Sequence, residues 1–548
     1  MRIGKLIRIL GEDVVDVSGD VDFAPAGIAG DHRKVNAGGL FVCVKGFASD
    51  GHDYAADALM NGAGALISQK TLPELNFPPD IAAGIKAFML VRDSRRALAA
   101  ASQLYYGEPT KRLRLVGVTG TKGKTTTVYM IRSILRAAGI KAGMLGTVEN
   151  DVGGELIHAD RTTPGAVEFA AYLSQMLERG CSHAVMEVSS QGLALSRVDY
   201  CMFEAGVFTN FYRDHISPRE HADMDEYLAA KLKLFSMCKN AVINADIHEY
   251  ETVKDAFMKG CQAASHLRGD GGPEGRVMYP LREDSGTEGR VMYPLREGGG
   301  SEGRGMLSFS SDEANANHPA ADIRASRIEL LRGAKAGTRF FVETPRFSGT
   351  LTVGLPGRYN ISNALAAISV CEQLGISFDA ISEGLRNVEV RGRTQYIDEG
   401  QDFSVLVDFA HNAASLEALL QMLREYGYKR VTTVFGCGGG RASERRYDMG
   451  EVSGRYSNLT VITSDNPRQE APGCIMEDIE AGMRRTEGRY IMIEDRREAI
   501  DYAIKNAERG EMVLIAGKGH ETTQTFADRV IPFDDAQVAR DCLRAINK

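Results

Sequence analysis

A glycine-rich loop between a strand-like run and a long amphipathic segment constrains the fold of this chain more than any other feature. Residues 117–127 read Gly-Val-Thr-Gly-Thr-Lys-Gly-Lys-Thr-Thr-Thr, at the end of the apolar run 113–118. The segment that follows has apolar residues at the spacing of one helical face, and Gly139 is its expected stop. Glycines let backbone N–H groups turn onto phosphate oxygens, and a helix N-terminus adds partial positive charge. The sequence therefore predicts a strand, a phosphate-binding loop and a helix.

Individual side chains of this loop have the chemistry that nucleotide phosphates require. Lys124 is placed to reach the β- and γ-phosphates, and the Thr125 hydroxyl is placed to ligate magnesium. Strict Walker spacing has glycine where this chain has Val118, but the flanking strand and helix favour phosphate binding over a plain turn. The remaining residues of the predicted cradle are Gly120, Thr121, Lys122, Gly123 and Thr126.

The last part of the chain alternates strand-like runs with helical segments. Near-continuous apolar or β-branched runs lie at 403–407, 431–435, 459–463, 490–493 and 512–515. Such runs indicate a parallel sheet covered on both faces. Ligands of such sheets bind beyond the carboxyl ends of the strands. Polar clusters are expected at these ends, and they comprise residues 436–441, 464–468 and 517–521.

Composition excludes several classes of protein. The chain has 548 residues, enough for three or four domains, and a net charge of −8, which argues against coating of nucleic acid or anionic membrane. No run approaches the ~18 apolar residues of a spanning helix, and the start lacks the pattern of a signal peptide. The nine cysteines have no CxxC spacing, so we expect buried thiols in a cytoplasmic protein that neither enters a membrane nor binds nucleic acid. We expect a monomer.

A short repeat interrupts the alternating pattern. The decapeptide at 274–283 recurs at 288–297, with a period of 14 residues. Glycine, proline and charged residues dominate it, so it cannot bury a core. We predict a flexible surface insertion near residues 268–306, and a docking motif is the alternative. We expect three domains, with bounds of 1–108, 109–391 and 392–548.

Motifs along almost the whole chain resemble the Mur ligase family. The loop from Gly120 is similar to the ATP loop of that family, which shares its departure from Walker spacing. The other motifs that carry the resemblance lie at 31–35, 39–41 and 50–52, at 161–164, 187–190 and 213–215, and at 392–393, 408–411, 465–468 and 517–521. The resemblance implies an α/β fold of three domains: a UDP-substrate-binding N-terminal domain, a central ATPase domain with a P-loop, and a Rossmann-like C-terminal domain that binds an amino acid.

The resemblance also implies an ATP-dependent ligase that joins a carboxylate to an amine through an acyl phosphate. Lys124, Glu187, His215 and Lys231 correspond to family residues with catalytic roles. Thr125, Glu187, His215 and Lys231 correspond to those that hold magnesium, the lysine after carbamylation by carbon dioxide. From residue type alone, Glu187 would be a surface charge, His215 a core histidine and Lys231 a helix-surface lysine.

The same resemblance assigns the nucleotide contacts. Those of the UDP-MurNAc-dipeptide are Arg33, Thr162, Thr163, Ser189 and Arg197, and those of ATP outside the loop are Asn360, Asn363, Arg393 and Asp408. Helix capping or surface pairing is the alternative for Asn360. The chain departs from the family at His32, at Leu195 and in segment 216–225.

The motif from Asp465 to Arg468 concerns the amine substrate. A guanidinium offers a fork of donors that suits a carboxylate. Meso-diaminopimelate ends in one carboxylate and one ammonium, and the resemblance to the family favours it as the amine that is added to UDP-MurNAc-L-Ala-D-Glu. The residues expected to bind it are Arg441, Asp465, Asn466, Arg468, Gly517 and Glu521. The alternatives are a loop salt bridge for Arg468, L-lysine or another amino acid as substrate, a folylpolyglutamate synthase-like ligase, and a noncatalytic nucleotide-binding scaffold.

Overall fold

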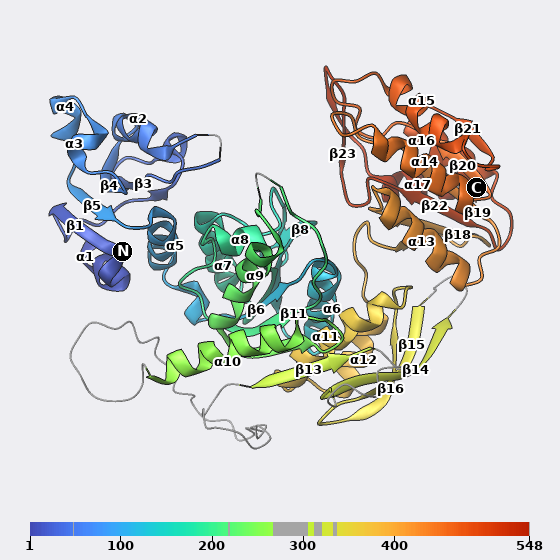
Figure 1. The fold of residues 1–548 in the computed structure, drawn as a ribbon, viewed down its shortest axis with the longest axis horizontal. Helices are drawn as coiled ribbons and strands as arrows, with labels where there is room; N and C mark the ends of the chain where they lie inside the picture. Colours follow the sequence, from blue (N-terminus) through green and yellow to red (C-terminus); the bar gives the residue numbers. More distant parts are fainter. Residues whose placement is uncertain (48, 218–219, 267–304, 312–320, 332–336, 547–548) are drawn as a thin grey trace. The chain divides into compact units, whose positions relative to one another are not determined.

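The computed structural model describes residues 1–47, 49–217, 220–266, 305–311, 321–331 and 337–546 (Figure 1). The chain divides into two compact units, one of Met1–Arg324 with Leu365–Ile381 and one of Ala325–Ala364 with Ser382–Lys548. The insertion predicted from the repeat at 274–297 lies outside the described residues. In the described part, no helix is both long and apolar enough to span a membrane.

A five-stranded sheet opens the first unit, in the order β1-β5-β4-β3-β2. Its strands are β1 (Val14–Gly19), β2 (Ile28–Ala29), β3 (Gly39–Val42), β4 (Ala63–Ser68) and β5 (Ala87–Val91). Successive side chains of β3 face opposite sides. Leu40 and Val42 pack with helices α1 (Ile3–Leu10) and α5 (Ser94–Tyr105), and Phe41 packs with α2 (Ala55–Met60). The runs expected at 39–45 and 94–106 are therefore β3 and α5.

A parallel sheet forms the core of the rest of the first unit. Strand β6 (Arg114–Thr119) lies between β10 (His183–Glu187) and β11 (Phe203–Phe208) and is parallel to both. Beyond them, β7 (Ala142–Leu145) pairs with β10 and β12 (Cys238–Asn244) pairs with β11, again in parallel. The carboxyl ends of these strands consequently meet at one edge.

The predicted strand, loop and helix at the centre of this sheet are confirmed. Helix α6 (Lys124–Ala137) follows the loop, and Ala138 is its C-cap. Gly139 is the expected stop, with φ of 71° and its N–H bonded to Arg136 O.

The other α-helices and strands that lie wholly within the first unit are α3 (Leu72–Leu75), α4 (Pro79–Ala82), β8 (Glu149–Asp151), β9 (Leu156–His158), α7 (Ala166–Glu178), α8 (Ser190–Ala194), α9 (Met224–Ser236), α10 (Tyr250–His266) and β13 (Met306–Ser310).

The parallel sheet expected in the last part of the chain lies in the second unit, with strands in the order β17-β18-β22-β19-β20-β21. Its strands are β17 (Gln395–Ile397), β18 (Ser404–Asp408), β19 (Val431–Phe435), β20 (Leu459–Ile462), β21 (Tyr490–Met492) and β22 (Met512–Ala516). All except β17 run parallel. The five runs expected in the last part of the chain are therefore β18 to β22.

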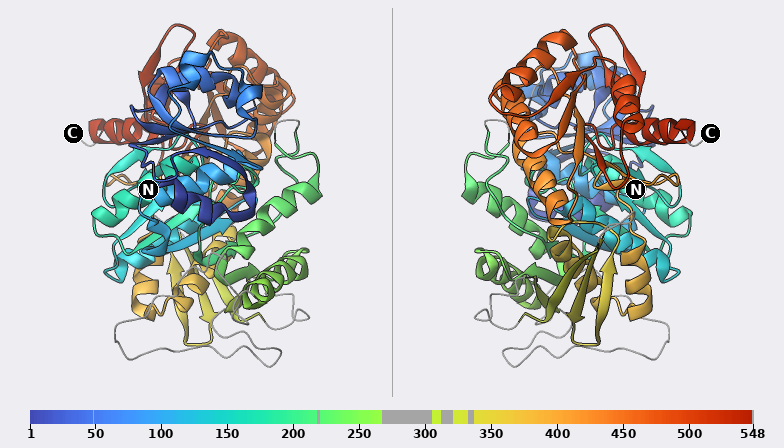
Figure 2. Two further views of the ribbon diagram at one scale, coloured as in Figure 1. Left: turned by 90° about the vertical axis from the view of Figure 1, so that its left-hand side faces the viewer. Right: turned by 90° about the vertical axis from the view of Figure 1, so that its right-hand side faces the viewer.

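Helices cover both faces of this sheet (Figure 2). Leu406 and Leu514 face α13 (Ala413–Glu425), α14 (Glu444–Tyr456) and α15 (Pro472–Met483), whereas Val407 and Val513 face α16 (Arg496–Lys505) and α17 (Asp535–Ile546). Both faces are buried, which explains why the strands lack alternation of polar and apolar residues. The remaining elements are β14 (Ile323–Leu331), β15 (Gly337–Glu343), β16 (Ser348–Val353), α11 (Tyr359–Gln373), α12 (Phe378–Arg386), β23 (Thr523–Thr525) and β24 (Val530–Pro532).

Candidate active site

The end of β11 holds the phosphate-binding loop in place. Thr121 N donates to Asn210 O at 2.9 Å, Lys122 N donates to Asn210 Oδ1 at 2.8 Å, and Thr209 Oγ1 donates to Lys122 O at 2.8 Å. A Cβ on Gly120 would lie 2.0 Å from Thr209 Oγ1, so this position requires glycine. The sequence pattern did not single out Thr209 and Asn210, although they follow a parallel strand next to β6.

Two lysine ammonium groups converge on one carbonyl of the loop. Lys124 Nζ donates to Gly120 O at 2.9 Å and to Thr121 O at 3.0 Å, and Lys231 Nζ donates to the same Gly120 O at 2.8 Å. Lys231 is 1% exposed. The surface position that its residue type alone suggests is therefore wrong. Burial, and then the charge of Lys124, hold the pKa of Lys231 well below its usual value.

Glu187, at the end of β10, faces the loop. Its side chain is buried, not solvated as residue type alone suggests. Oε1 accepts from Thr125 Oγ1 at 3.0 Å and from Thr147 N at 2.8 Å, and Oε2 accepts from Thr147 Oγ1 at 3.2 Å. The Thr147 hydroxyl also bonds Thr162 Oγ1 at 3.0 Å. Carboxylate and hydroxyl oxygens are ligands that magnesium prefers, so Thr125 and Glu187 fit that ion.

His215 lies in the loop after β11, packs against Tyr227 as Lys231 does, and has no hydrogen bond to Glu187. Its backbone is left-handed, with φ of 58°, and its Nδ1 lies 2.8 Å from Glu220 Oε1. Its ring centroid is 5.6 Å from that of Tyr227, over which the Lys231 ammonium lies at 4.4 Å. Among the described residues, no group of three or more His, Cys, Asp or Glu could hold a metal. A magnesium ion that keeps waters and phosphate ligands needs no such cage.

Four predicted substrate-binding positions form a hydrogen-bonded network with the end of β10. Thr163 Oγ1 bonds Glu187 O at 3.0 Å and lies 3.1 Å from Ser189 Oγ. Ser189 N donates to Thr163 Oγ1 at 2.9 Å, and Arg197 Nη1 donates to Thr163 O at 2.9 Å. Thr162 joins the same network through Thr147. The structure therefore brings these residues beside the predicted magnesium ligands.

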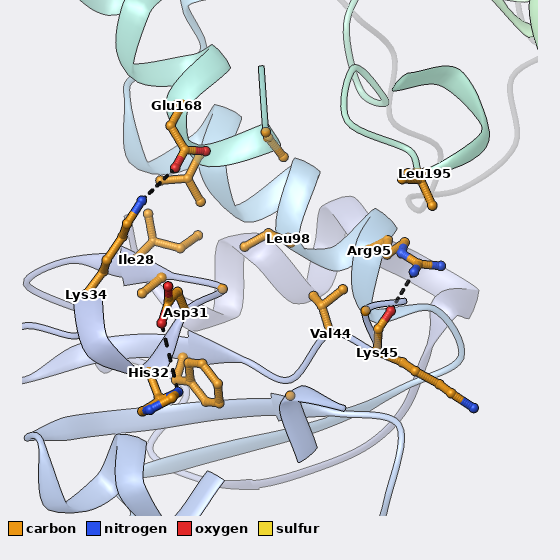
Figure 3. Close-up of a pocket in the computed structure, with 18 of the residues that line it drawn as sticks. Ile28, Asp31, His32, Lys34, Val44, Lys45, Arg95, Leu98, Glu168 and Leu195 are labelled. Atoms are coloured by element: carbon orange, nitrogen blue, oxygen red, sulfur yellow. Dashed lines mark hydrogen bonds and ion pairs between the residues drawn. The ribbon is translucent and has the colours of Figure 1, made fainter. Parts of the chain in front are cut away.

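A pocket of about 640 Å³ opens next to this network (Figure 3). Its walls come from strands β2 and β3 and the loops that follow them, from Arg95 and Leu98 of α5, and from residues 161–197, all within the first unit. Positive charges outnumber negative ones: it is lined by Arg33, Lys34, Lys45, Arg95, Arg161 and Arg197, and by Asp31 and Glu168. Burial, and then Arg161 and Arg95, lower the pKa of Arg197 to about 10. The pocket is suited to an anionic ligand although the whole chain is acidic.

Two of the positions at which the chain departs from the family, His32 and Leu195, line the same pocket. The His32 ring stacks on Tyr54, with centroids 4.6 Å apart and planes at 2°, and Leu195 adds an apolar wall. Arg33 donates to both oxygens of Asp31, at 2.9 and 2.7 Å, and chiefly through this bond the pKa of Asp31 falls to about 2. Arg33 is thus paired within its own turn.

In the second unit, the polar clusters that follow three parallel strands are in contact, as expected from the strand ends. Asn466 Nδ2 donates to Glu521 Oε2 at 2.7 Å, and Gly439 N donates to Asn466 O at 2.9 Å. Arg468, with φ of 55°, donates to Gly439 O at 2.6 Å. No described acidic residue forms an ion pair with Arg468, which argues against the loop salt bridge.

The other residues expected to bind the amine lie at the same strand ends. Asp465 Oδ1 accepts from Asn466 N at 2.6 Å. Gly517 has φ of 108°, and its N–H bonds Asp408 O at 3.1 Å. Arg441 is exposed in the loop after β19. The cluster therefore presents charges of both signs at the carboxyl end of the sheet.

The residues expected to bind ATP outside the loop lie in the second unit, and the phosphate loop lies in the first. Asp408 is buried, and its oxygens accept from Thr394 N at 2.7 Å and from Ala410 N at 2.8 Å. Burial raises the pKa of Asp408, and the nearby Arg393 opposes that rise. The Arg393 guanidinium lies 4.7 Å from the Phe409 ring centroid.

Asn360 and Asn363 are buried in the first turn of α11. Asn360 Nδ2 donates to Pro356 O at 2.6 Å, and Asn363 Nδ2 donates to Asn360 Oδ1 at 3.0 Å. An N-cap side chain accepts from a backbone N–H, whereas Asn360 donates to a carbonyl. The helix-capping alternative for Asn360 therefore has no support in these contacts.

Comparisons with known proteins identify one family in the N-terminal, middle and C-terminal parts of the chain. Family models described as Mur ligase family, catalytic domain, as Mur ligase middle domain and as Mur ligase, glutamate ligase domain match residues 26–106, 118–267 and 392–519. A UDP-N-acetylmuramoyl-L-alanyl-D-glutamate–2,6-diaminopimelate ligase from Caldanaerobacter subterraneus subsp. tengcongensis is 35% identical over 545 residues, which are 99% of this chain and 100% of that protein. The chain belongs to the Mur ligase family.

Two further Mur ligases show similar agreement. The ligase of the same description from Alkaliphilus metalliredigens is 37% identical over 540 residues, 98% of this chain and 97% of that protein. A solved structure of such a ligase matches with a TM-score of 0.67 at 25% identity and covers 100% of this chain and 99% of that one. The three-domain α/β architecture expected from the motifs is therefore confirmed.

Arg445 of this Mur ligase chain is a candidate that sequence reasoning missed. It lies in the first turn of α14 and is half-buried. Burial lowers its pKa, and Arg441 and Arg468 are among the charges that act on it. The run Glu444-Arg-Arg446 reads as helix surface, so only the tertiary structure places this cation beside the predicted amine site.

Proposed function

We propose that this chain is an ATP-dependent ligase that joins meso-diaminopimelate to UDP-MurNAc-L-Ala-D-Glu during peptidoglycan precursor synthesis. The contact of Thr125 Oγ1 with Glu187 Oε1, at 3.0 Å beside the phosphate loop, carries the proposal, in a chain that aligns end to end with such ligases. The γ-phosphate passes to the substrate carboxylate to give an acyl phosphate. The amine then attacks its carbonyl carbon, and phosphate leaves.

The loop holds the phosphates and offsets their charge. The N-terminus of α6, which begins at Lys124, faces the anion, as phosphoryl transfer requires. We propose that Lys124 turns from the carbonyls of Gly120 and Thr121 onto phosphate oxygens. A bond from an ammonium to an anion is stronger than one to a neutral carbonyl, which favours this exchange.

Thr125 and Glu187 are the proposed magnesium ligands, with His215 and Lys231 as further ones. Magnesium, when bound, offsets negative charge on the phosphates. Lys231 serves after carbamylation: its neutral amine forms a bond to the carbon of CO₂ and releases a proton. Its burial and lowered pKa support this role, since they increase the share of neutral amine.

Lys231→Ala tests that role. We expect the ligase rate to fall by about a hundredfold or more, because the anion that would bridge metal and phosphate is lost. A short-chain carboxylic acid should restore part of the rate by occupying the space of the carbamate. Phosphate release with and without the acid measures both effects, and full activity of the unrescued variant would contradict the assignment.

We assign the anionic pocket and the network beside β10 to UDP-MurNAc-dipeptide. Its excess of Lys and Arg supports binding of a diphosphate, and Arg33, Thr162, Thr163, Ser189 and Arg197 are the proposed contacts. Asn360, Asn363, Arg393 and Asp408 are proposed to bind the rest of ATP. For the amine, Arg441 and Arg468 are proposed to take its distal carboxylate, and Asp465, Gly517 and Glu521 its ammonium. Asn466 is a further proposed substrate-binding residue.

A coupled phosphate-release assay tests the activity. Purified protein receives ATP, magnesium and UDP-MurNAc-dipeptide, with meso-diaminopimelate, L-lysine or glutamate in separate reactions. We expect release with meso-diaminopimelate and a far lower rate with the others. Comparable release with lysine would support the lysine-adding alternative, and none with any amine would contradict a ligase.

We further propose that the protein acts as a cytoplasmic monomer. All nine cysteines are free thiols, and eight of them are buried, which supports a reducing compartment. Sedimentation of the purified protein at assay concentration tests the oligomeric state. A single species of twice the chain mass would contradict the monomer.

A further inference from the structure

Lys518 follows β22 and lies fully buried beside the proposed amine site. Its side chain has no exposed surface. Nζ donates to Glu521 Oε2 at 3.0 Å, to Thr523 O at 2.7 Å and to Asn466 Oδ1 at 3.3 Å. An ammonium has three donors, so these contacts satisfy it. A buried charge is costly unless it is paired in this way, which makes the site sensitive to loss of any partner.

The same contacts fix the orientation of two side chains proposed to bind the amine. Asn466 Oδ1 accepts from Lys518 Nζ and from Thr525 N, at 2.9 Å, while Asn466 Nδ2 donates to Glu521 Oε2 at 2.7 Å. A flipped amide would place donors against donors. The Asn466 side chain is therefore locked in one orientation.

Glu521 is anchored through one oxygen only. Oε2 receives the bonds from Lys518 and Asn466, and none of the residues that the structure describes donates to Oε1. The Glu521 side chain is 36% exposed, whereas that of Lys518 is 0% exposed. Lys518 and Asn466 thus hold Oε2 in place, and Oε1 is left for a ligand.

We propose that Lys518 is a positioning residue that determines the choice of amine substrate, an inference that rests on the ligase activity proposed above. It orients Glu521 Oε1 toward the ammonium at the distal, zwitterionic end of the amino acid. It also adds positive charge next to the Glu521 carboxylate. The polar clusters carry Arg441, Arg468 and Lys518 against Asp465 and Glu521. Their excess positive charge favours a head that also brings a carboxylate.

Charge explains why Lys518 discriminates against lysine. Diaminopimelate is L-lysine with one additional carboxylate on the carbon that carries the distal amine. L-lysine would add a lone ammonium to a cluster that is already positive, and like charges repel more strongly in a partly buried site than in water. Loss of the Lys518 charge should weaken this repulsion and also release Glu521.

Lys518→Met tests the proposal, because methionine has a similar length but neither charge nor donors. We expect the KM for meso-diaminopimelate to rise about tenfold or more, since a charge-assisted bond that orients Glu521 is lost. The KM values for ATP and UDP-MurNAc-dipeptide should stay unchanged, and the ratio of kcat/KM for diaminopimelate over lysine should fall. Lys505→Met is the matched control, because Lys505 pairs with Asp501 on the exposed side of α16.

A double-mutant cycle with Glu521→Gln separates positioning from simple support of the fold. If Lys518 acts through Glu521, adding Lys518→Met to Glu521→Gln should cause little further loss of diaminopimelate binding, measured by calorimetry without ATP. If Lys518→Met melts below the assay temperature, Lys518→Gln replaces it with the same expectation for the selectivity ratio. Additive losses, or an equal rise in all three KM values, would overturn the proposal.

The ligase proposal and this inference fail in different ways. Wild-type protein that releases no phosphate with diaminopimelate would contradict the ligase activity. Active wild-type protein together with a folded Lys518→Met variant of unchanged KM and selectivity would overturn only the role of Lys518.

Discussion

The Gly120 carbonyl accepts hydrogen bonds from both Lys124 and Lys231. This contact shows how the surroundings of a single residue determine its chemistry. The Lys124 ammonium supplies positive charge for phosphate, and burial together with that charge lowers the pKa of Lys231. The charge of Glu187 is buried nearby and satisfied by hydroxyl and backbone donors. These residues are set apart by their surroundings, because lysine and glutamate are ordinarily solvated.

Lys124→Ala should abolish ligation while leaving the fold intact. The Lys124 ammonium is the proposed phosphate contact of the loop, so we expect kcat/KM for ATP to fall by about a thousandfold when it is lost. Phosphate release and a melting curve measure the two properties. Lys239→Ala is the control, since Lys239 pairs with Glu204 away from the loop. A rate within tenfold of wild type would exclude Lys124 from the reaction.

Arg468→Ala should remove the use of meso-diaminopimelate. Alanine cannot offer a donor fork to the distal carboxylate, so we expect its KM to rise by about a hundredfold. Arg468→Lys keeps the charge without the fork and should recover only part of the loss. Initial rates over a range of diaminopimelate concentrations measure the effect. Kinetics identical to wild type in the alanine variant would refute the assignment.

At the scale of elements, parallel strand ends assemble the site. In the first unit, β6, β7, β10 and β11 deliver the phosphate loop, Thr147, Glu187 and Asn210 to one edge. In the second unit, β19, β20 and β22 bring their polar clusters together in the same way. Parallel strands end side by side, so residues far apart in the sequence become neighbours.

His183, at the start of β10, should make the stability of the first unit depend on pH. Burial chiefly lowers its pKa from 6.5 to about 4. Between these values the unfolded chain binds a proton that the folded chain does not. The stability present above pH 6.5 is therefore lost as the pH falls toward 4, by at most about 3 kcal/mol.

His183→Gln should make this pH dependence shallower, because glutamine does not titrate. Urea unfolding at several pH values between 7 and 4 measures the slope for both proteins. His158→Gln is the matched control, since the His158 side chain is 80% exposed and should leave the slope unchanged. Parallel slopes for wild type and His183→Gln would contradict the burial argument.

At the scale of the whole molecule, the repeat at 274–297 is expected to contribute neither core nor catalysis. Glycine, proline and charge dominate it, so it has too little apolar surface to offset the entropy of ordering. Deletion of residues 272–304 should leave the melting temperature and the ligase rate close to those of the intact chain. Loss of both would show that the flexible-insertion interpretation is wrong and would favour a docking or structural role.

The sequence by itself determined the strand, loop and helix around Lys124 and the five parallel strands of the second unit, because these depend on local periodicity and glycine placement. It also determined the family, through motifs in a fixed order. Only the tertiary structure decided that Lys231 is buried, that Thr147 and Asn210 support the site, and that Lys518 lies beneath Glu521. Burial and pairing arise from strands that meet in space, and no local pattern in the chain records which side chains will meet.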